Sequence, residues 1–201
     1  MNLPNKLTLF RIILIPLFVL VFYLPFLKQN ITIINFELGL ENIIAIIIFS
    51  IAAYTDRLDG KIARNNNIVT TFGKFMDPLA DKLLVSAAFL VAVELHLMPA
   101  FLVIIIISRE FMVTGIRLLA ISEGKVIAAS SLGKLKTVSQ IILVIVLFLF
   151  DLKSEGNYMI FVEFDIFHLI IDTLMILVTG FTIISGFDYL KKNKELILYT
   201  K

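Results

Sequence analysis

Cysteine is absent from this chain of 201 residues, and charged side chains make up only 17% of it. The absence of cysteine excludes disulfides and thiolate chemistry. An ordinary soluble domain is about 25% charged, so the shortage of charge argues against that class of protein. The sequence also contains neither a G-x-G-x-x-G nor a P-loop motif, which excludes the two glycine-rich phosphate-binding signatures.

Long apolar runs take the place of the missing charge. Hydrophobic residues make up 59% of the chain, and its mean hydropathy is +0.98. A transmembrane helix needs about 20 predominantly apolar residues, and the runs lack the alternation of barrel strands. We therefore predict an all-α, polytopic membrane protein that forms one domain over residues 1–201. The six predicted transmembrane helices cover residues 7–27, 42–64, 77–97, 99–121, 137–152 and 168–190.

Lysine and arginine are distributed unevenly between the two sides of such a bundle. One side holds only Lys28 and Lys153. The other side holds Lys6, Lys61, Arg64, Lys74, Lys125, Lys134, Lys136, Lys191, Lys192, Lys194 and Lys201. Because cytoplasmic loops carry the excess of basic residues, we expect both termini on the cytoplasmic side of the cell membrane. His96 and His168 fall near the opposite side, where we expect no metal role.

Three of the apolar runs are too short to span a bilayer by themselves. Residues 43–55, 83–93 and 99–107 provide thirteen, eleven and nine residues before charged or polar side chains intervene. These helices reach spanning length only if their charged ends are included. Charged groups at that depth cannot face lipid. The lengths therefore predict a polar cavity that opens to the cytoplasm.

The segment from residue 56 to residue 81 contains four of the chain's eight aspartates. Asp56 and Asp59 are i, i+3 on one predicted helix, and Asp77 and Asp81 are i, i+4 on the next, so each pair projects from one face. Two facing helices would gather four carboxylates, which then need a counter-charge unless some of them are protonated. The full spacing is D-x2-D-G-x2-A-R-x8-G-x3-D-x3-D, formed by Asp56, Asp59, Gly60, Ala63, Arg64, Gly73, Asp77 and Asp81.

An all-oxygen cluster of this kind suits hard divalent cations. Four aspartates can hold two metal ions roughly 4 Å apart, the arrangement used for in-line attack at phosphorus. Gly60 and Gly73 leave room for a phosphate, and Arg64 can pair with one through its two-pronged guanidinium. Pro78 would either start the second helix or kink it beside Asp77. The plainer alternative, aspartates that cap helices and pair with nearby cations, leaves the full pattern unexplained.

The eight residues of this pattern resemble the signature of the CDP-alcohol phosphatidyltransferases, integral-membrane enzymes with six transmembrane helices. The resemblance implies a homodimer and two ions of Mg²⁺ or Mn²⁺ per active site. It implies that the metal ligands are Asp56, Asp59, Asp77 and Asp81. It implies that a CDP-linked lipid binds around Asp56, Gly60, Ala63, Arg64 and Gly73. Asp81 would also act as general base on the acceptor hydroxyl, which requires it to stay ionised.

Segments outside the signature resemble a bacterial branch of this family that acts on glycerol 3-phosphate. The opening of the chain follows N-x-P-N-x-L-T-x-x-R, and residues 108–110 and 133–137 are also similar to segments of that branch. The resemblance then implies CDP-diacylglycerol and glycerol 3-phosphate as substrates, with phosphatidylglycerol phosphate and CMP as products.

Cations in the second half of the chain favour an acceptor that carries a phosphate. Arg109 and Arg117 lie two turns apart on the fourth predicted helix, and Lys134 and Lys136 open the fifth. Together with Thr8 of the opening motif, they are the predicted acceptor-phosphate residues. The two lysines could instead only obey the positive-inside rule.

Other functions stay open on the sequence alone. A sibling enzyme could use inositol phosphate, serine or phosphatidylglycerol as acceptor. A metal-ion transporter would also place carboxylates within a membrane, and a purely structural subunit is a third possibility. Glu110 is as well suited to pairing inside the bundle as to a functional role. We expect no nucleic-acid partner.

Overall fold

The structure, a computed structural model of the chain, describes residues 2–33, 36–65, 71–122, 131–151 and 166–194. Several helical residues are described by their backbone alone, among them residues 56–65, 71–75, 77, 78 and 81. By its internal contacts the chain forms two units, Met1–Leu97 with Val144–Lys153, and Met98–Leu143 with Ser154–Lys201. Each unit is described by itself below.

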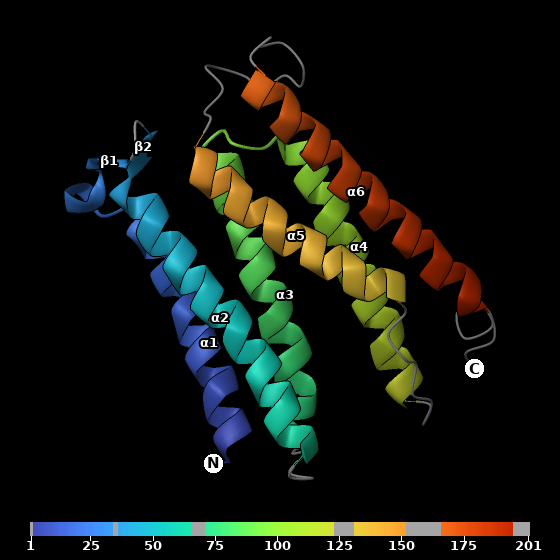
Figure 1. Cartoon of the computed structure of the whole chain (residues 1–201). Helices are drawn as coiled ribbons and strands as arrows, with labels where there is room; N and C mark the ends of the chain where they lie inside the picture. Colours follow the sequence, from blue (N-terminus) through green and yellow to red (C-terminus); the bar gives the residue numbers. More distant parts are fainter. Residues whose placement is uncertain (1, 34–35, 66–70, 123–130, 152–165, 195–201) are drawn as a thin grey trace. The chain divides into compact units, whose positions relative to one another are not determined.

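Six α-helices account for most of the described residues, as the sequence predicts (Figure 1). A short 3₁₀ helix (Pro25–Leu27) and a two-stranded sheet, β1 (Asn30–Ile33) with β2 (Phe36–Gly39), separate the first two helices. The helices are α1 (Leu3–Val21), α2 (Leu40–Asn65), α3 (Thr71–Glu94), α4 (Ala100–Ser122), α5 (Ser131–Phe150) and α6 (Ile166–Lys192).

Several helix ends differ from their predicted positions. Helix α1 begins at Leu3 because Asn2 is extended and a proline fits the first turn, where its missing N–H is not needed. Helices α3 and α5 begin at Thr71 and Ser131, not at residues 77 and 137. Pro78 therefore lies inside α3 and does not start it. Polar first turns extended both helices beyond the apolar runs on which the prediction rested.

The β1–β2 hairpin was not predicted. The two strands are antiparallel, and Ile31 pairs with Leu38 while Asn30 pairs with Gly39. Leu38 is buried at 7% exposure. The signal for this hairpin was the β-branched stretch at residues 31–34, which favours a strand but stands within a segment that reads as a connection between apolar runs.

The first unit is built on the packing of α1 against α2 and α3 (Figure 1). Phe18 of α1 is fully buried at its centre. Its ring lies 5.7 Å from that of Phe22 at the end of α1, 6.1 Å from that of Phe49 on α2 and 5.8 Å from that of Phe148 on α5. The contacts with Phe22 and Phe148 are edge-to-face, an arrangement that gives a helix interface specific geometry.

The directions of these three helices decide which of their ends meet. Tyr23, just after α1, donates a hydrogen bond to the Glu94 carboxylate at the end of α3, at 2.7 Å. Helices α1 and α3 therefore run parallel, while α2 runs in the opposite direction and packs mainly against α1 (Figure 1). The start of α1, the end of α2 and the start of α3 consequently share one end of the unit.

The second unit contains α4, α6 and the N-terminal part of α5. Val113, Ile116 and Ala120 of α4 form a buried cluster with Tyr189 near the end of α6. Farther toward the start of both helices, Arg109 contacts Ser185. Because residues earlier in α4 contact residues earlier in α6, and later residues contact later ones, the two helices run parallel.

The outward faces of the helices remain strongly apolar. Ile104, Leu177 and Phe187 are 63%, 63% and 68% exposed, and exposed apolar surface on this scale marks contact with lipid or with another protein. Among the described residues, Leu132–Phe150 and Ile166–Lys192 are long and apolar enough to cross a membrane, whereas the apolar part of α2, Leu40–Thr55, is shorter. Six crossings and a cytoplasm-facing cavity stay predictions.

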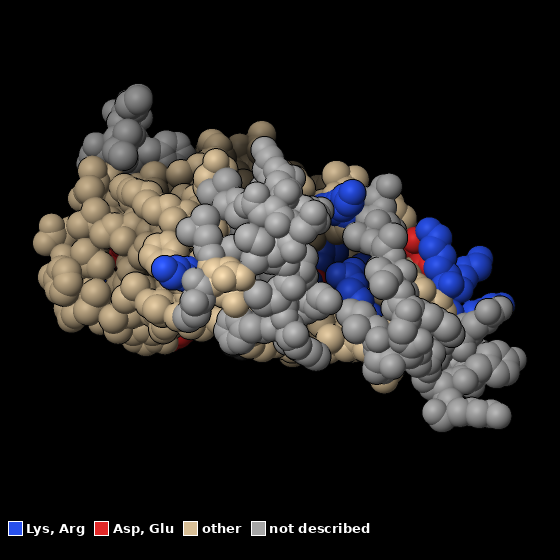
Figure 2. Space-filling view, turned by 90° about the horizontal axis from the view of Figure 1, so that it is seen from below, with Lys and Arg blue, Asp and Glu red and all other residues tan. Residues whose placement is uncertain are grey.

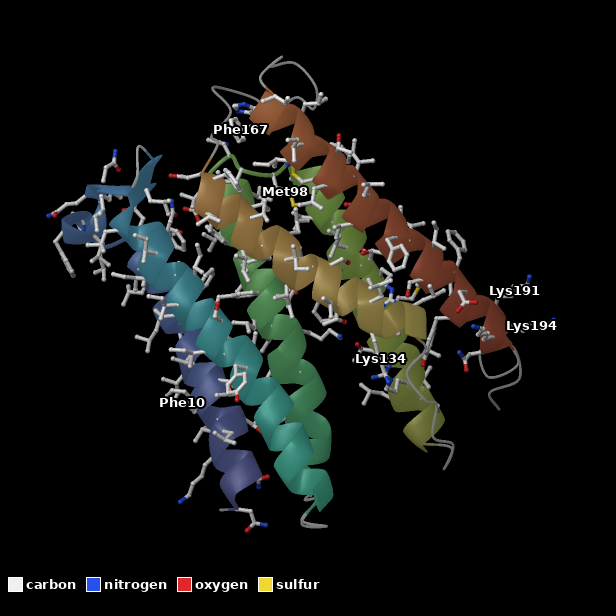
Figure 3. All side chains as sticks on the ribbon, viewed as in Figure 1. Phe10, Met98, Lys134, Phe167, Lys191 and Lys194 are labelled. Atoms are coloured by element: carbon white, nitrogen blue, oxygen red, sulfur yellow. The ribbon has the colours of Figure 1, made fainter. Side chains whose placement is uncertain are left out.

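Replacing Phe18 by alanine is expected to destabilise the first unit by about 3–5 kcal/mol, the usual cost of removing a buried phenylalanine. The cavity would interrupt three aromatic contacts. Thermal unfolding in detergent measures the effect. Phe10→Ala, on the same helix at 45% exposure (Figure 3), is the control and should leave the midpoint nearly unchanged. Equal midpoints for the two variants would contradict the central role of Phe18.

Candidate active site

The four predicted metal-ligating aspartates lie on two neighbouring helices of the first unit. The backbone puts Asp56 and Asp59 on α2 and Asp77 and Asp81 on α3, which confirms the helical spacing on which the prediction depends. Helices α2 and α3 are in contact. Both segments lie toward the shared end of the unit. The carboxylates themselves are outside the described residues.

The other four signature residues are likewise placed by the backbone alone. Gly60, Ala63 and Arg64 belong to α2, and Gly73 belongs to α3. The surroundings of these four residues are not described, so their contacts with a CDP-linked lipid stay predictions. Among the histidines and acidic residues whose side chains are described, which do not include the four signature aspartates, no group of three could hold a metal ion.

Helix α1 brings two buried polar residues to the same end of the first unit. Thr8 and Arg11 are both 0% exposed, and they lie one turn apart near the start of α1. A buried guanidinium is costly unless polar or acidic groups surround it. Since α1 packs on the two helices that carry the aspartates, Thr8 and Arg11 of the opening motif belong to the interior of the unit.

In the second unit, Arg109 is the centre of a polar network within otherwise apolar helices. Its Nη2 donates to Ser185 Oγ at 2.8 Å, and its Nη1 donates to Glu110 Oε1 at 3.3 Å. Its Nε is buried and has no hydrogen-bond partner among the described residues. The stem of Arg109 passes over Gly186 of α6, where an added Cβ would stand 2.9 Å from Arg109 Cγ.

Glu110 connects Arg109 to the first turns of α5. Its carboxylate, on a residue that is 4% exposed, forms an ion pair with Lys136, which is 2% exposed. Lys136 is therefore buried against Glu110, while Lys134 lies exposed at the start of α5 (Figure 3). Two of the predicted acceptor residues, Arg109 and Lys136, thus meet at one carboxylate.

Small polar residues form a stripe on α6, and one of them, Ser185, belongs to this network. Thr179, Thr182 and Ser185 recur at every third position, and each is at most 3% exposed. Gln140 of α5 donates to Thr182 Oγ1 at 3.3 Å. None of these three residues of α6 was among the predicted site residues. Their signal was the i, i+3 spacing of hydroxyl side chains within a long apolar helix.

A cavity of about 230 Å³ lies beside the stem of Arg109, between α4 and α6. It is lined by Arg109, Gly186 and mainly apolar side chains that include Met112 and Phe187. Two turns along α4, Arg117 also has a buried Nε with no hydrogen-bond partner in the described part of the chain. Buried guanidinium groups with unused donors suit the binding of an anion such as phosphate.

Comparisons with known proteins agree with the aspartate signature. The family model for CDP-alcohol phosphatidyltransferase matches residues 1–184. A CDP-diacylglycerol–glycerol-3-phosphate 3-phosphatidyltransferase of Bacillus subtilis is 45% identical over 196 residues, which cover 98% of this chain and 97% of the relative. Enzymes of the same name from Rickettsia typhi and Salmonella typhimurium are 34% identical over 194 residues and 40% identical over 148 residues.

The Rickettsia match covers 96% of this chain and 97% of the relative, and the Salmonella match covers 70% and 73%. The similarity thus includes both units and is not confined to the aspartate segment. The chain belongs to the CDP-alcohol phosphatidyltransferase family.

Proposed function

We propose that the protein transfers the phosphatidyl group of CDP-diacylglycerol to glycerol 3-phosphate, giving phosphatidylglycerol phosphate and CMP. The observation that carries this proposal is the 45% identity to an enzyme with those named substrates along nearly the whole of both chains. The aspartate signature supports the reaction type. The buried cations of α4 and α5 support an acceptor that carries its own phosphate.

The proposed transfer is a substitution at one phosphorus. The acceptor hydroxyl gives its proton to Asp81 and attacks the phosphorus that bears diacylglycerol. A new P–O bond forms to glycerol 3-phosphate, and the bond between that phosphorus and the CMP oxygen breaks. Arg64, with its two-pronged guanidinium, would bind the pyrophosphate of the donor. Gly60, Ala63 and Gly73 would let the CDP group approach the backbone of α2 and α3.

The donor set of this segment fits divalent metal ions. Carboxylate oxygens are preferred ligands of Mg²⁺ and Mn²⁺, and α2 and α3, which carry the four aspartates, pack together. Asp56, Asp59, Asp77 and Asp81 would hold two such ions. When bound, these ions would neutralise charge on the pyrophosphate and favour the ionised form of Asp81.

Two apolar helices, together with membership of a family of lipid-synthesising enzymes, indicate a membrane protein. We infer six crossings of the cell membrane, with both termini and the active site on the cytoplasmic side. Lys191 and Lys192 in the last turn of α6 support this orientation. In Figure 2, Lys and Arg atoms outnumber Asp and Glu atoms on the face shown. The family resemblance further supports a homodimer.

The acceptor phosphate would bind in the part of the second unit that contains Arg109, Arg117, Lys134 and Lys136. Glycerol 3-phosphate and an inositol phosphate would both satisfy these cations. An acceptor screen with labelled CDP-diacylglycerol distinguishes them. Product formed only from inositol phosphate would replace glycerol 3-phosphate in the proposal, and metal flux into proteoliposomes without release of CMP would indicate a transporter.

Purified protein with both substrates should release CMP only when Mg²⁺ or Mn²⁺ is present. Asp81→Asn should lower kcat by about 10²–10⁴, the range typical of a lost general base. Asp188→Asn is the control, because Asp188 pairs with Lys192 near the surface end of α6, and it should turn over normally. Full activity in a chelator, or near-normal turnover of Asp81→Asn, would contradict the proposed chemistry.

Arg109→Ala should raise the KM for glycerol 3-phosphate by at least about tenfold, as expected for the loss of a charge-assisted hydrogen bond. The KM for CDP-diacylglycerol should change far less. Initial rates at varied concentrations of each substrate measure both constants. Lys191→Ala removes an exposed cation at the end of α6 (Figure 3) and serves as the control. Equal shifts in the two KM values would count against an acceptor role for Arg109.

A further inference from the structure

Arg109 is held in position by three neighbours within the second unit. Glu110 accepts from Nη1 at 3.3 Å, and Ser185 accepts from Nη2 at 2.8 Å. Gly186 leaves the space that the stem occupies, because a Cβ there would come within 2.9 Å of Cγ. A guanidinium fixed at both Nη atoms and along its stem has little freedom to move, so its remaining donors are held in fixed positions.

Unused donors remain on the fixed guanidinium. An arginine side chain has five N–H donors, and in the described structure Nε has no partner while each Nη uses one bond. The side chain is 10% exposed. A buried donor left without a partner is costly, and an anion that reaches Arg109 would satisfy it.

Lys136 differs from Arg109 in what surrounds its charge. Its ammonium is 2% exposed and pairs with the Glu110 carboxylate, which is itself buried. The three charges sum to one positive charge, so one of the two cations balances Glu110. To reach a phosphate, Lys136 would have to leave a buried carboxylate beside a second anion, and like charges at that distance repel strongly.

We propose that Glu110, Ser185 and Gly186 are positioning residues that fix Arg109 for the acceptor phosphate, and that Lys136 acts as the counter-charge of Glu110 and does not touch the acceptor. This inference rests on the proposed function. Of the two cations that contact Glu110, Arg109 is then the ligand of the acceptor phosphate, and Lys136 acts only through Glu110. This inference also gives Glu110 a role that its adjacency to Arg109 alone did not decide.

The network predicts a rescue by a second substitution. Lys136→Met leaves the negative charge of Glu110 beside Arg109 and brings the sum of charges to zero. The KM for glycerol 3-phosphate should then rise by at least about tenfold. Adding Glu110→Gln restores the single positive charge and keeps a carbonyl acceptor for Nη1. The double variant should therefore return to within about threefold of the original KM.

Steady-state rates for the single and double variants, with unfolding midpoints in detergent, test this rescue. A merely structural pair would lower stability and kcat without a selective change in the acceptor KM. A double variant as impaired in acceptor KM as Lys136→Met would identify Lys136 as a direct ligand and overturn the inference. If Arg109→Ala itself shows no acceptor selectivity, the proposed acceptor site fails, so the two failures are distinguishable.

Two glycines on α6 provide an independent, matched test. Gly186→Ala should push the stem of Arg109 away and raise the KM for glycerol 3-phosphate about tenfold, since small displacements of a positioning group are costly. Gly180→Ala meets nothing within 4 Å and should stay within about twofold. Alanine favours a helix more than glycine does, so neither change should unfold α6. An unchanged acceptor KM in Gly186→Ala would overturn the role given to Gly186.

Discussion

The buried carboxylate of Glu110 is the constraint on which the second unit depends. A carboxylate cannot remain ionised among apolar helices unless cations lie beside it. Glu110 is 4% exposed, and its partners come from its own helix and from α5. The pairing with Lys136 sets the register of α5 against α4, and the bond from Arg109 to Ser185 does the same for α6. Apolar contacts alone would fix these registers less firmly, because lipid tails compete for the same surfaces.

The presence of six helices followed from the apolar runs, but their ends did not. A run shows where a helix must be apolar, and it gives no sign of a polar first turn such as that of α5, which begins at Ser131. The end of α3 and the end of α5 depend on backbone conformation. His96, just after α3, and Asp151, just after α5, adopt positive φ values of 58° and 44°. Those conformations are uncommon for residues other than glycine, and an apolar run carries no record of them.

The arrangement of the aspartates could be predicted because the two members of each pair are close together in the sequence. Asp56 and Asp59 share one helix, and Asp77 and Asp81 share the next, so spacing alone gives their faces. The Arg109 network could be predicted only in part. The cations were visible, but Ser185 is 76 positions from Arg109 and Glu110 is 26 from Lys136. Which cation is free to meet a ligand is a property of packing, and the sequence showed both as equivalent positive charges.

This separation between local and distant residues bears on how a family can share one reaction and differ in acceptor. In the proposed function, the signature residues bind the CDP-linked donor and the metal ions from two adjacent helices, whereas the acceptor contacts depend on how α4 and α6 hold one arginine. A guanidinium held by Ser185 and by the space at Gly186 would bind a phosphate at only one position. Discrimination between acceptors then comes from the distance between that phosphate and the attacking hydroxyl, which differs from one phosphorylated alcohol to another. Such selectivity can change through the neighbours of Arg109 while every residue of the signature stays the same.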